Sequence, residues 1–196
     1  MLIMPAFHRY LDEGAIIGRL LAAFGEVEFM VGICLGHTLG NRDTGIKALY
    51  RIRGETARIK TADALMRGAY EKCGLKAEYT DGMGAARFCV TIRNQFSHCH
   101  WADDPTAGLF FTDLGEAAKD PYTLDFVWRH VDKALLKDHE AYFGYAMEAL
   151  FFLENEFLVR AGKLRVHAFP MPTARKPPSL HNPEDQHIPP WQGQVP

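Results

Sequence analysis

Residues 132–160 read DKALLKDHEAYFGYAMEALFFLENEFLVR, the stretch with the clearest periodicity in the chain. Apolar and aromatic side chains recur in it at steps of three and four residues, the spacing that places side chains on one face of an α-helix. The stretch therefore predicts a long helix packed against a core. The members of this face are Leu135, His139, Tyr142, Ala146, Leu150, Leu153 and Phe157.

The same spacing occurs in three earlier parts of the chain. It predicts a helix over 12–39 and a second helix over 44–71. A third helix is expected after a turn at Asp81-Gly82, and the turn residues at 103–105 are expected to stop it. The residues that this third helix turns inward are Ala85, Cys89, Ile92 and Phe96.

Between the third and the last helix, residues 108–114 form a short apolar run bounded by turn residues, which is typical of a strand. We expect it to pair with residues 122–126 as a small hairpin. Beyond Phe169 the chain is rich in proline, which favours extended polyproline II backbone or disorder over folded structure. If this tail is ordered, we expect it to be held against its own domain or against a neighbouring subunit. The predicted fold is thus an all-α helical bundle over 1–165, with a β-hairpin or irregular excursion before the last long helix, and a Pro-rich tail over 166–196.

The first helix has two unusual features. Gly18, Gly25 and Gly32 repeat every seven residues, so another backbone is expected to pack closely along that line. Glu28 lies on the apolar stripe of the same helix. It is either a buried partner of a cation that supports an active site, or a residue at the edge of the stripe that reaches solvent.

Composition narrows the class of protein. With 47% hydrophobic and 23% charged residues over 196 positions, the chain can bury a core. We find neither a secretory leader nor eighteen consecutive apolar residues, so we expect a cytoplasmic protein that does not enter a membrane. The four cysteines show no CxxC spacing, which argues against disulfides and a structural zinc site.

The charge is distributed unevenly along the chain, although the net charge is only −2. Residues 42–93 carry eleven Lys and Arg against six Asp and Glu, whereas residues 103–156 carry four against twelve. This pattern fits a basic surface that holds a polyanion. It fits equally well a set of solvated helix faces whose charges pair with one another.

The polar run Arg93-Asn94-Gln95-Phe96-Ser97-His98 is the stretch that points to chemistry. On a regular helix Asn94 and His98 share a face, so the amide can hold one imidazole nitrogen. Arg93 is turned about 140° away from His98. The two can therefore meet only if the helix ends near Phe96, or if a second copy of the chain supplies the missing group. No metal site is expected at His98-Cys99-His100, because side chains two apart on a helix diverge.

Residues 92–98, Ile-Arg-Asn-Gln-Phe-Ser-His, resemble the Arg-x(4 to 6)-His signature of the HEPN superfamily, with its polar residue after the arginine. The pattern of helices resembles this family over about residues 10–162. The resemblance implies a metal-independent endoribonuclease without a cofactor, in which a homodimer brings both signatures to one cleft. It implies that His98 transfers the proton, Arg93 clamps the phosphate and Asn94 orients His98 or binds the phosphate. The supporting residues would be Glu28, which positions Arg93, together with Ser97 and His100.

Two further functions stay open. A non-catalytic HEPN-like module would dimerise and bind RNA, a nucleotide or a partner protein through the same cleft. A structural interaction protein would act through its Pro-rich tail. For the enzyme, the resemblance favours a toxin or defence component that acts on cellular RNA, with an antitoxin or another protein as its partner.

Overall fold

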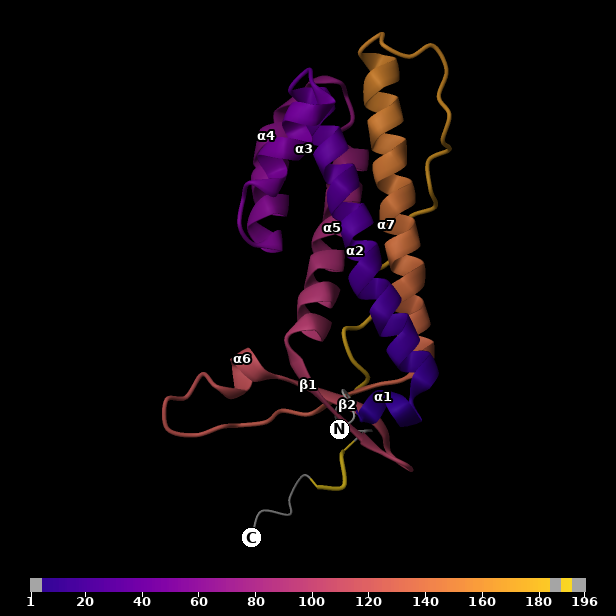
Figure 1. Ribbon diagram of the computed structural model, residues 1–196. Helices are drawn as coiled ribbons and strands as arrows, with labels where there is room; N and C mark the ends of the chain where they lie inside the picture. The colour runs from indigo at the N-terminus through magenta and orange to yellow at the C-terminus, as the bar shows by residue number, and fades with distance from the viewer. Residues whose placement is uncertain (1–4, 184–187, 192–196) are drawn as a thin grey trace. The chain divides into compact units, whose positions relative to one another are not determined.

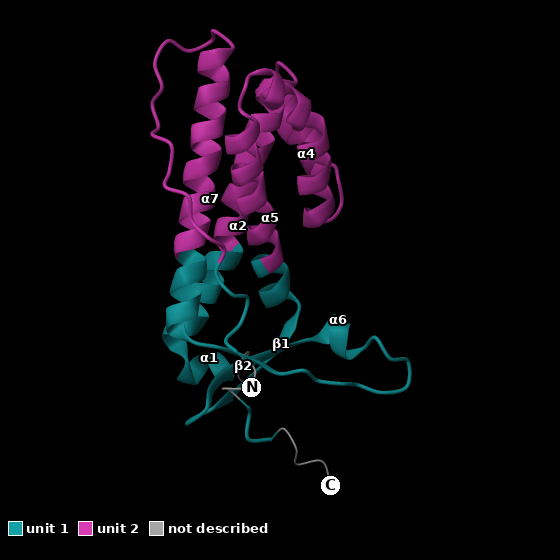
Figure 2. Cartoon of the chain, turned by 180° about the vertical axis from the view of Figure 1, so that it is seen from behind, with its two compact units in different colours: residues 1–21, 92–140, 178–196 teal, residues 22–91, 141–177 magenta. Residues whose placement is uncertain are grey.

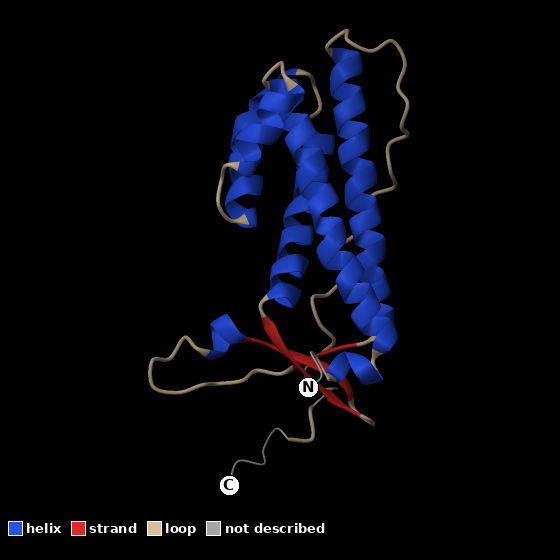
Figure 3. Ribbon diagram, viewed as in Figure 1, coloured by secondary structure: helices blue, strands red, loops and turns tan. Residues whose placement is uncertain are grey.

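The computed structural model describes residues 5–183 and 188–191, and these are mostly helical, with one small antiparallel sheet (Figures 1 and 3). The elements in chain order are α1 (Ala6–Arg9), α2 (Leu11–Thr38), α3 (Arg42–Tyr50), α4 (Glu55–Lys72), α5 (Lys76–Ser97), β1 (Cys99–Asp104), β2 (Gly108–Asp113), α6 (Leu114–Ala117), β3 (Arg129–Val131) and α7 (Lys133–Arg160).

The first and last predicted helices are confirmed as α2 and α7, within one residue at each end. The Asp132 carboxylate caps the start of α7 by accepting the Leu135 N–H at 2.8 Å. Gly162 ends that helix with φ 70°, a backbone conformation that glycine adopts without a steric cost. All members of the predicted inward face, from Leu135 to Phe157, are buried.

The prediction of one helix over 44–71 was wrong, because the chain breaks after Tyr50 and starts again as α4. Gly54 takes φ 82° immediately before α4, which a continuous helix does not allow. Upstream, Asn41 begins α3 by accepting the Thr44 N–H at 3.0 Å. The two helices form a hairpin whose short link spans residues 51–54 (Figure 1).

The turn predicted at Asp81-Gly82 was also wrong, because both residues lie inside α5. Gly82 serves close packing there: a Cβ on it would lie 2.5 Å from Leu153 Cδ1 of α7. The helix ends at Ser97 rather than near 103, because β1 begins at Cys99. The predicted inward residues Ala85, Cys89, Ile92 and Phe96 are all buried, which confirms that face.

The strand predicted over 108–114 is confirmed as β2, but its predicted partner was wrong. β2 is the central strand of the order β1-β2-β3, with Cys99 opposite Asp113 in one antiparallel pair and Leu109 opposite Val131 in the other. Residues 122–126 form neither helix nor strand. The excursion before the last helix is therefore a three-stranded sheet (Figure 3).

The chain divides into two compact units, which are described separately (Figure 2). Unit 1 comprises residues 1–21, 92–140 and 178–196, and unit 2 comprises residues 22–91 and 141–177. In unit 1 the Phe96 ring lies 5.6 Å from Phe111 and 5.7 Å from Trp101, centroid to centroid. In unit 2 the Tyr70 ring lies 4.6 Å from Phe157 and 4.9 Å from Tyr79. Each unit thus has an aromatic core.

Over residues 5–183 and 188–191, no helix combines the length and the apolar character that a membrane span requires. The four cysteines are all free thiols. Burial raises the pKa of Cys34 and of Cys99 to about 12, so both are protonated near neutral pH.

Close backbone packing occurs on α2, but not along the whole predicted glycine line. A Cβ on Gly18 or Gly25 would meet no atom within 4 Å, and on Gly32 it would make only ordinary contacts from 3.4 Å. The close approach lies one turn further on, where a Cβ on Gly45 of α3 would lie 2.3 Å from the Gly36 backbone nitrogen. Glycine at these two positions lets the α2 and α3 backbones touch.

We predict that Gly45→Ala lowers the free energy of unfolding by about 3 kcal/mol, because the added methyl group collides with rigid backbone. Gly25→Ala is the matched control. Its Cβ enters open space within a helix, so it should raise that free energy by about 1 kcal/mol. Urea denaturation followed by circular dichroism measures both values, and equal stability of the two variants would contradict the packing described for Gly45.

The Pro-rich tail is held against unit 1 by its backbone and by one aromatic ring. The carbonyl of Ser179 lies 2.7 Å from His139 Nε2, and the carbonyl of Leu180 accepts the Gln95 amide at 2.8 Å. The Asn182 N–H donates to the carbonyl of His130 at 2.9 Å. The tail is therefore held against its own chain, as one of the two expected arrangements requires.

Trp191 is the large apolar anchor of this tail, with its ring 5.5 Å from Phe110 and 5.6 Å from Trp128. We predict that Trp191→Ala lowers the free energy of unfolding of unit 1 by about 3 kcal/mol, because it removes a packed aromatic side chain. The fluorescence of Trp101 and Trp128, both in unit 1, reports the transition. Val166→Ala is the control, since Val166 is 77% exposed, and the two variants should differ clearly in urea midpoint.

Candidate functional site

The polar signature lies where α5 ends and β1 begins, in unit 1. Ser97 is the last residue of α5, His98 forms a bend, and Cys99 is the first residue of β1. His98 is exposed, whereas Arg93 and Asn94 are half-buried. The chain therefore changes direction at this point, as it must if Arg93 and His98 of one chain are to meet.

Arg93 and Asn94 form a polar pair on the last turns of α5. The Arg93 Nη1 group donates to Asn94 Oδ1 at 3.1 Å. Ser97 Oγ donates to the Asn94 carbonyl at 3.4 Å, which closes the end of the helix. No hydrogen bond joins Asn94 to His98 in the described part of the chain. The amide thus fixes the guanidinium rather than the imidazole, and the expected role of Asn94 in orienting His98 is not seen here.

Phe96 anchors this end of α5. It is buried, and its ring contacts His139 of α7 at 5.7 Å in addition to its contacts with Trp101 and Phe111. Its neighbours Gln95 and Ser97 are half-buried. A core anchor inside the signature holds the polar residues around it in a defined orientation.

His100, a predicted supporting residue, lies on β1 with its ring 5.9 Å from Trp128. His139 is a second histidine near the signature, through its contact with Phe96. Burial lowers the pKa of His139, so its ring is neutral near pH 7, and Nε2 lies against the Ser179 carbonyl. The sequence pattern identified His139 only as part of a core face. His98 and His100 are both exposed, and His98 is the one that lies at the break between α5 and β1.

Glu28, the residue expected to position Arg93, has a cationic partner within unit 2. Glu28 is buried at 4% exposure in unit 2, and both its carboxylate oxygens lie 2.8 Å from Arg58 Nη1. Arg58 also donates through Nε to the carbonyl of Ile52 at 2.8 Å and lies over the Tyr50 ring. Glu28 is thus a buried partner of a cation, but that cation is Arg58. No pattern in the sequence links the two residues.

Within the described ranges, no three His, Cys, Asp or Glu side chains are grouped so as to hold a metal ion. The side chains at the end of α5 offer a guanidinium, an amide, a hydroxyl and an imidazole. These groups suit the binding of an anion and the transfer of a proton.

Comparison with known proteins finds no matching family model, no matching curated protein and no matching solved structure.

We predict that Glu28→Gln and Arg58→Gln each lower the free energy of unfolding by about 2 kcal/mol, because each leaves a partly buried charge without its partner. The double variant should lose much less than the sum of the two single losses. Arg93→Gln combined with Glu28→Gln should instead be additive to within about 0.5 kcal/mol. Strong coupling between Glu28 and Arg93 in urea denaturation would contradict the pairing described above.

Proposed function

We propose that this protein is a metal-independent endoribonuclease of the HEPN type, with its site at the end of α5. The observation that carries the proposal is the exposed His98 at the break between α5 and β1, five residues after an Arg93 that is hydrogen-bonded to Asn94. A proton-transfer group and a phosphate-binding group are thus held at one helix end.

These groups fit the cleavage of RNA by its own 2′-hydroxyl. His98 takes the proton from that hydroxyl, because an imidazole ring carries both a nitrogen that can accept a proton and one that can donate one. The attacking oxygen then bonds to phosphorus and the 5′-oxygen leaves. Arg93 stabilises the negative charge that develops on the phosphoryl oxygens, through planar N–H donors that Asn94 holds in place. Ser97 and His100 lie on either side of His98 in the chain and complete the expected polar rim.

In this proposal the active form is a homodimer whose two signatures line one cleft. Cleavage needs one group that removes a proton and another that returns a proton to the leaving oxygen, and two copies of His98 supply both. Gly18 on α2 leaves open surface, which suits close packing of a second chain. The expected mass in light scattering is twice 22.1 kDa.

A cytoplasmic ribonuclease that acts on cellular RNA must be held in check, so we expect a toxin or defence component with an antitoxin or another partner protein. The likeness to the HEPN signature is the only support for this biological role. It concerns the short run of residues 92–98.

A second candidate function is RNA binding without cleavage, and the α3–α4 hairpin favours it. Residues 42–60 carry six Lys and Arg against two acidic residues. Arg58 is paired with Glu28, but Lys47, Arg51 and Arg53 are exposed. Exposed cations concentrated on one hairpin attract a phosphate backbone whether or not the chain cleaves it.

The experiment that tests the enzyme is cleavage of single-stranded RNA in EDTA by wild type, His98→Ala and His8→Ala. We predict that His98→Ala lowers the cleavage rate by about 10³-fold, because it removes the proton-transfer group. Its thermal stability should stay close to that of wild type, since an exposed imidazole contributes little to packing. His8 is an exposed histidine of α1 outside the signature, so His8→Ala should cleave as fast as wild type.

The possible outcomes separate the two candidate functions. If wild type binds RNA but does not cleave it in EDTA, the binding function replaces the enzyme. If His98→Ala cleaves at the wild-type rate, the assignment of His98 fails. If light scattering shows a monomer and this monomer still cleaves RNA, a site formed by two chains is excluded and a single signature is sufficient for cleavage.

A further inference from the structure

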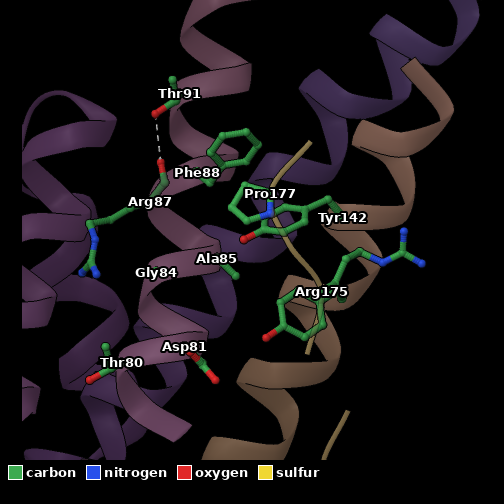
Figure 4. Close-up of a pocket in the computed structure, with 11 residues that line it drawn as sticks. Thr80, Asp81, Gly84, Ala85, Arg87, Phe88, Thr91, Tyr142, Arg175 and Pro177 are labelled. Carbon is green, nitrogen blue, oxygen red and sulfur yellow. Dashed lines mark hydrogen bonds between the residues drawn. The ribbon is translucent and has the colours of Figure 1, made fainter. Parts of the chain in front are cut away.

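An open pocket of about 450 Å³ lies in unit 2, between the α5 and α7 helices and the segment that follows α7 (Figure 4). All its lining residues belong to this one unit, and none belongs to the signature at the end of α5. Its volume is within the range of small-molecule sites.

One wall of the pocket is aromatic. Phe88 of α5 and Tyr142 of α7 meet edge to face, with ring centroids 5.1 Å apart, and Tyr145 lies 5.6 Å beyond Tyr142. Figure 4 shows Pro177 beside Phe88 and Tyr142, on the segment that follows α7. Such a wall stacks well against a planar ring.

Tyr142 adds a hydrogen-bonding group to this wall. Its side chain is 3% exposed and lines the pocket. Burial raises the pKa of Tyr142 to about 12, and the nearby Asp81 carboxylate adds to this shift. The hydroxyl is therefore protonated at neutral pH and can donate a hydrogen bond.

Two residues of opposite charge, Asp81 and Arg175, line the pocket without pairing, and Figure 4 shows the Arg175 guanidinium pointing away from Asp81. In the described part of the chain, neither the Asp81 carboxylate nor the Arg175 guanidinium makes a side-chain hydrogen bond or an ion pair, and both residues are exposed. The third charged residue, Arg87, is already held by Asp63 at 3.0 Å. Asp81 and Arg175 are thus the acceptor and the cation that remain for a ligand.

We propose that this pocket binds a guanine nucleotide, with the base against the aromatic wall, its donor edge on Asp81 and its phosphate on Arg175. A carboxylate only accepts hydrogen bonds, so it selects a ring that presents two adjacent donors. The N1–H and N2 amino groups of guanine form such an edge, whereas adenine presents an acceptor beside its amino group. Guanidinium groups bind phosphate through two parallel hydrogen bonds.

This site is separate from the proposed ribonuclease function and does not depend on it. Isothermal titration calorimetry of the full chain with guanosine monophosphate, adenosine monophosphate, guanosine and inorganic phosphate is the test. Guanosine monophosphate should bind about tenfold or more tightly than each of the other three, because adenosine monophosphate and guanosine each lack one of the three contacts and inorganic phosphate lacks two.

Two variants assign the contacts. Asp81→Asn should abolish the preference for guanine over adenine, and Arg175→Gln should lower the affinity for guanosine monophosphate to that for guanosine. Glu148→Gln and Lys176→Gln are the matched controls, since both residues are exposed and neither lines the pocket. Both control variants should bind as wild type does.

The proposal is overturned if guanosine monophosphate gives no saturable heat at millimolar concentration, or if adenosine monophosphate binds equally well. It is also overturned if Arg175→Gln leaves the affinity unchanged. Failure of this test leaves the EDTA-resistant cleavage assay unaffected, because that assay measures a variant of His98 in unit 1.

Discussion

The ion pair between Glu28 and Arg58 is the interaction on which the packing of unit 2 depends. A carboxylate at 4% exposure cannot remain charged without a partner, and Arg58 meets both its oxygens with one nitrogen. For Arg58 to reach α2, the chain must turn back between α3 and α4, and Gly54 supplies the turn with a positive φ. The contact between Gly36 and Gly45 then brings the α2 and α3 backbones together. The buried Glu28–Arg58 ion pair and the two glycines thus together position the α3–α4 hairpin against α2.

In unit 1 the comparable constraint is Phe96. Its ring is enclosed by Trp101, Phe111 and His139, so the last turn of α5 is tied to β1, β2 and α7 at once. The polar residues before and after it then project from an end that cannot rotate freely. A site that must bind a charged group benefits from such an anchor, because rigid donors lose less freedom when they bind.

The Pro-rich tail takes part in both units rather than following a finished domain. Ser179 and Leu180 satisfy polar groups of His139 and Gln95 through their backbone carbonyls, which any residue provides. Earlier in the tail, the Phe169 ring stacks on Phe151 of α7 at 5.3 Å. Proline lowers the entropy that an extended segment loses on docking, which explains how a segment with few aliphatic residues stays ordered.

The amino-acid sequence by itself determined the helices with long, regular apolar faces, because their periodicity is a local property: α2, α7 and the inward face of α5 follow from it. It also singled out Arg93, Asn94 and His98, since their order along the chain is the signal. Only the tertiary structure decided the rest. The break at Gly54, the helical Gly82 and the partner of β2 depend on neighbours distant in sequence. The partner of Glu28 and the charged residues of the pocket also depend on such neighbours. Tertiary packing determines which side chains meet, and it brings together residues that are not related by any regular spacing in the sequence.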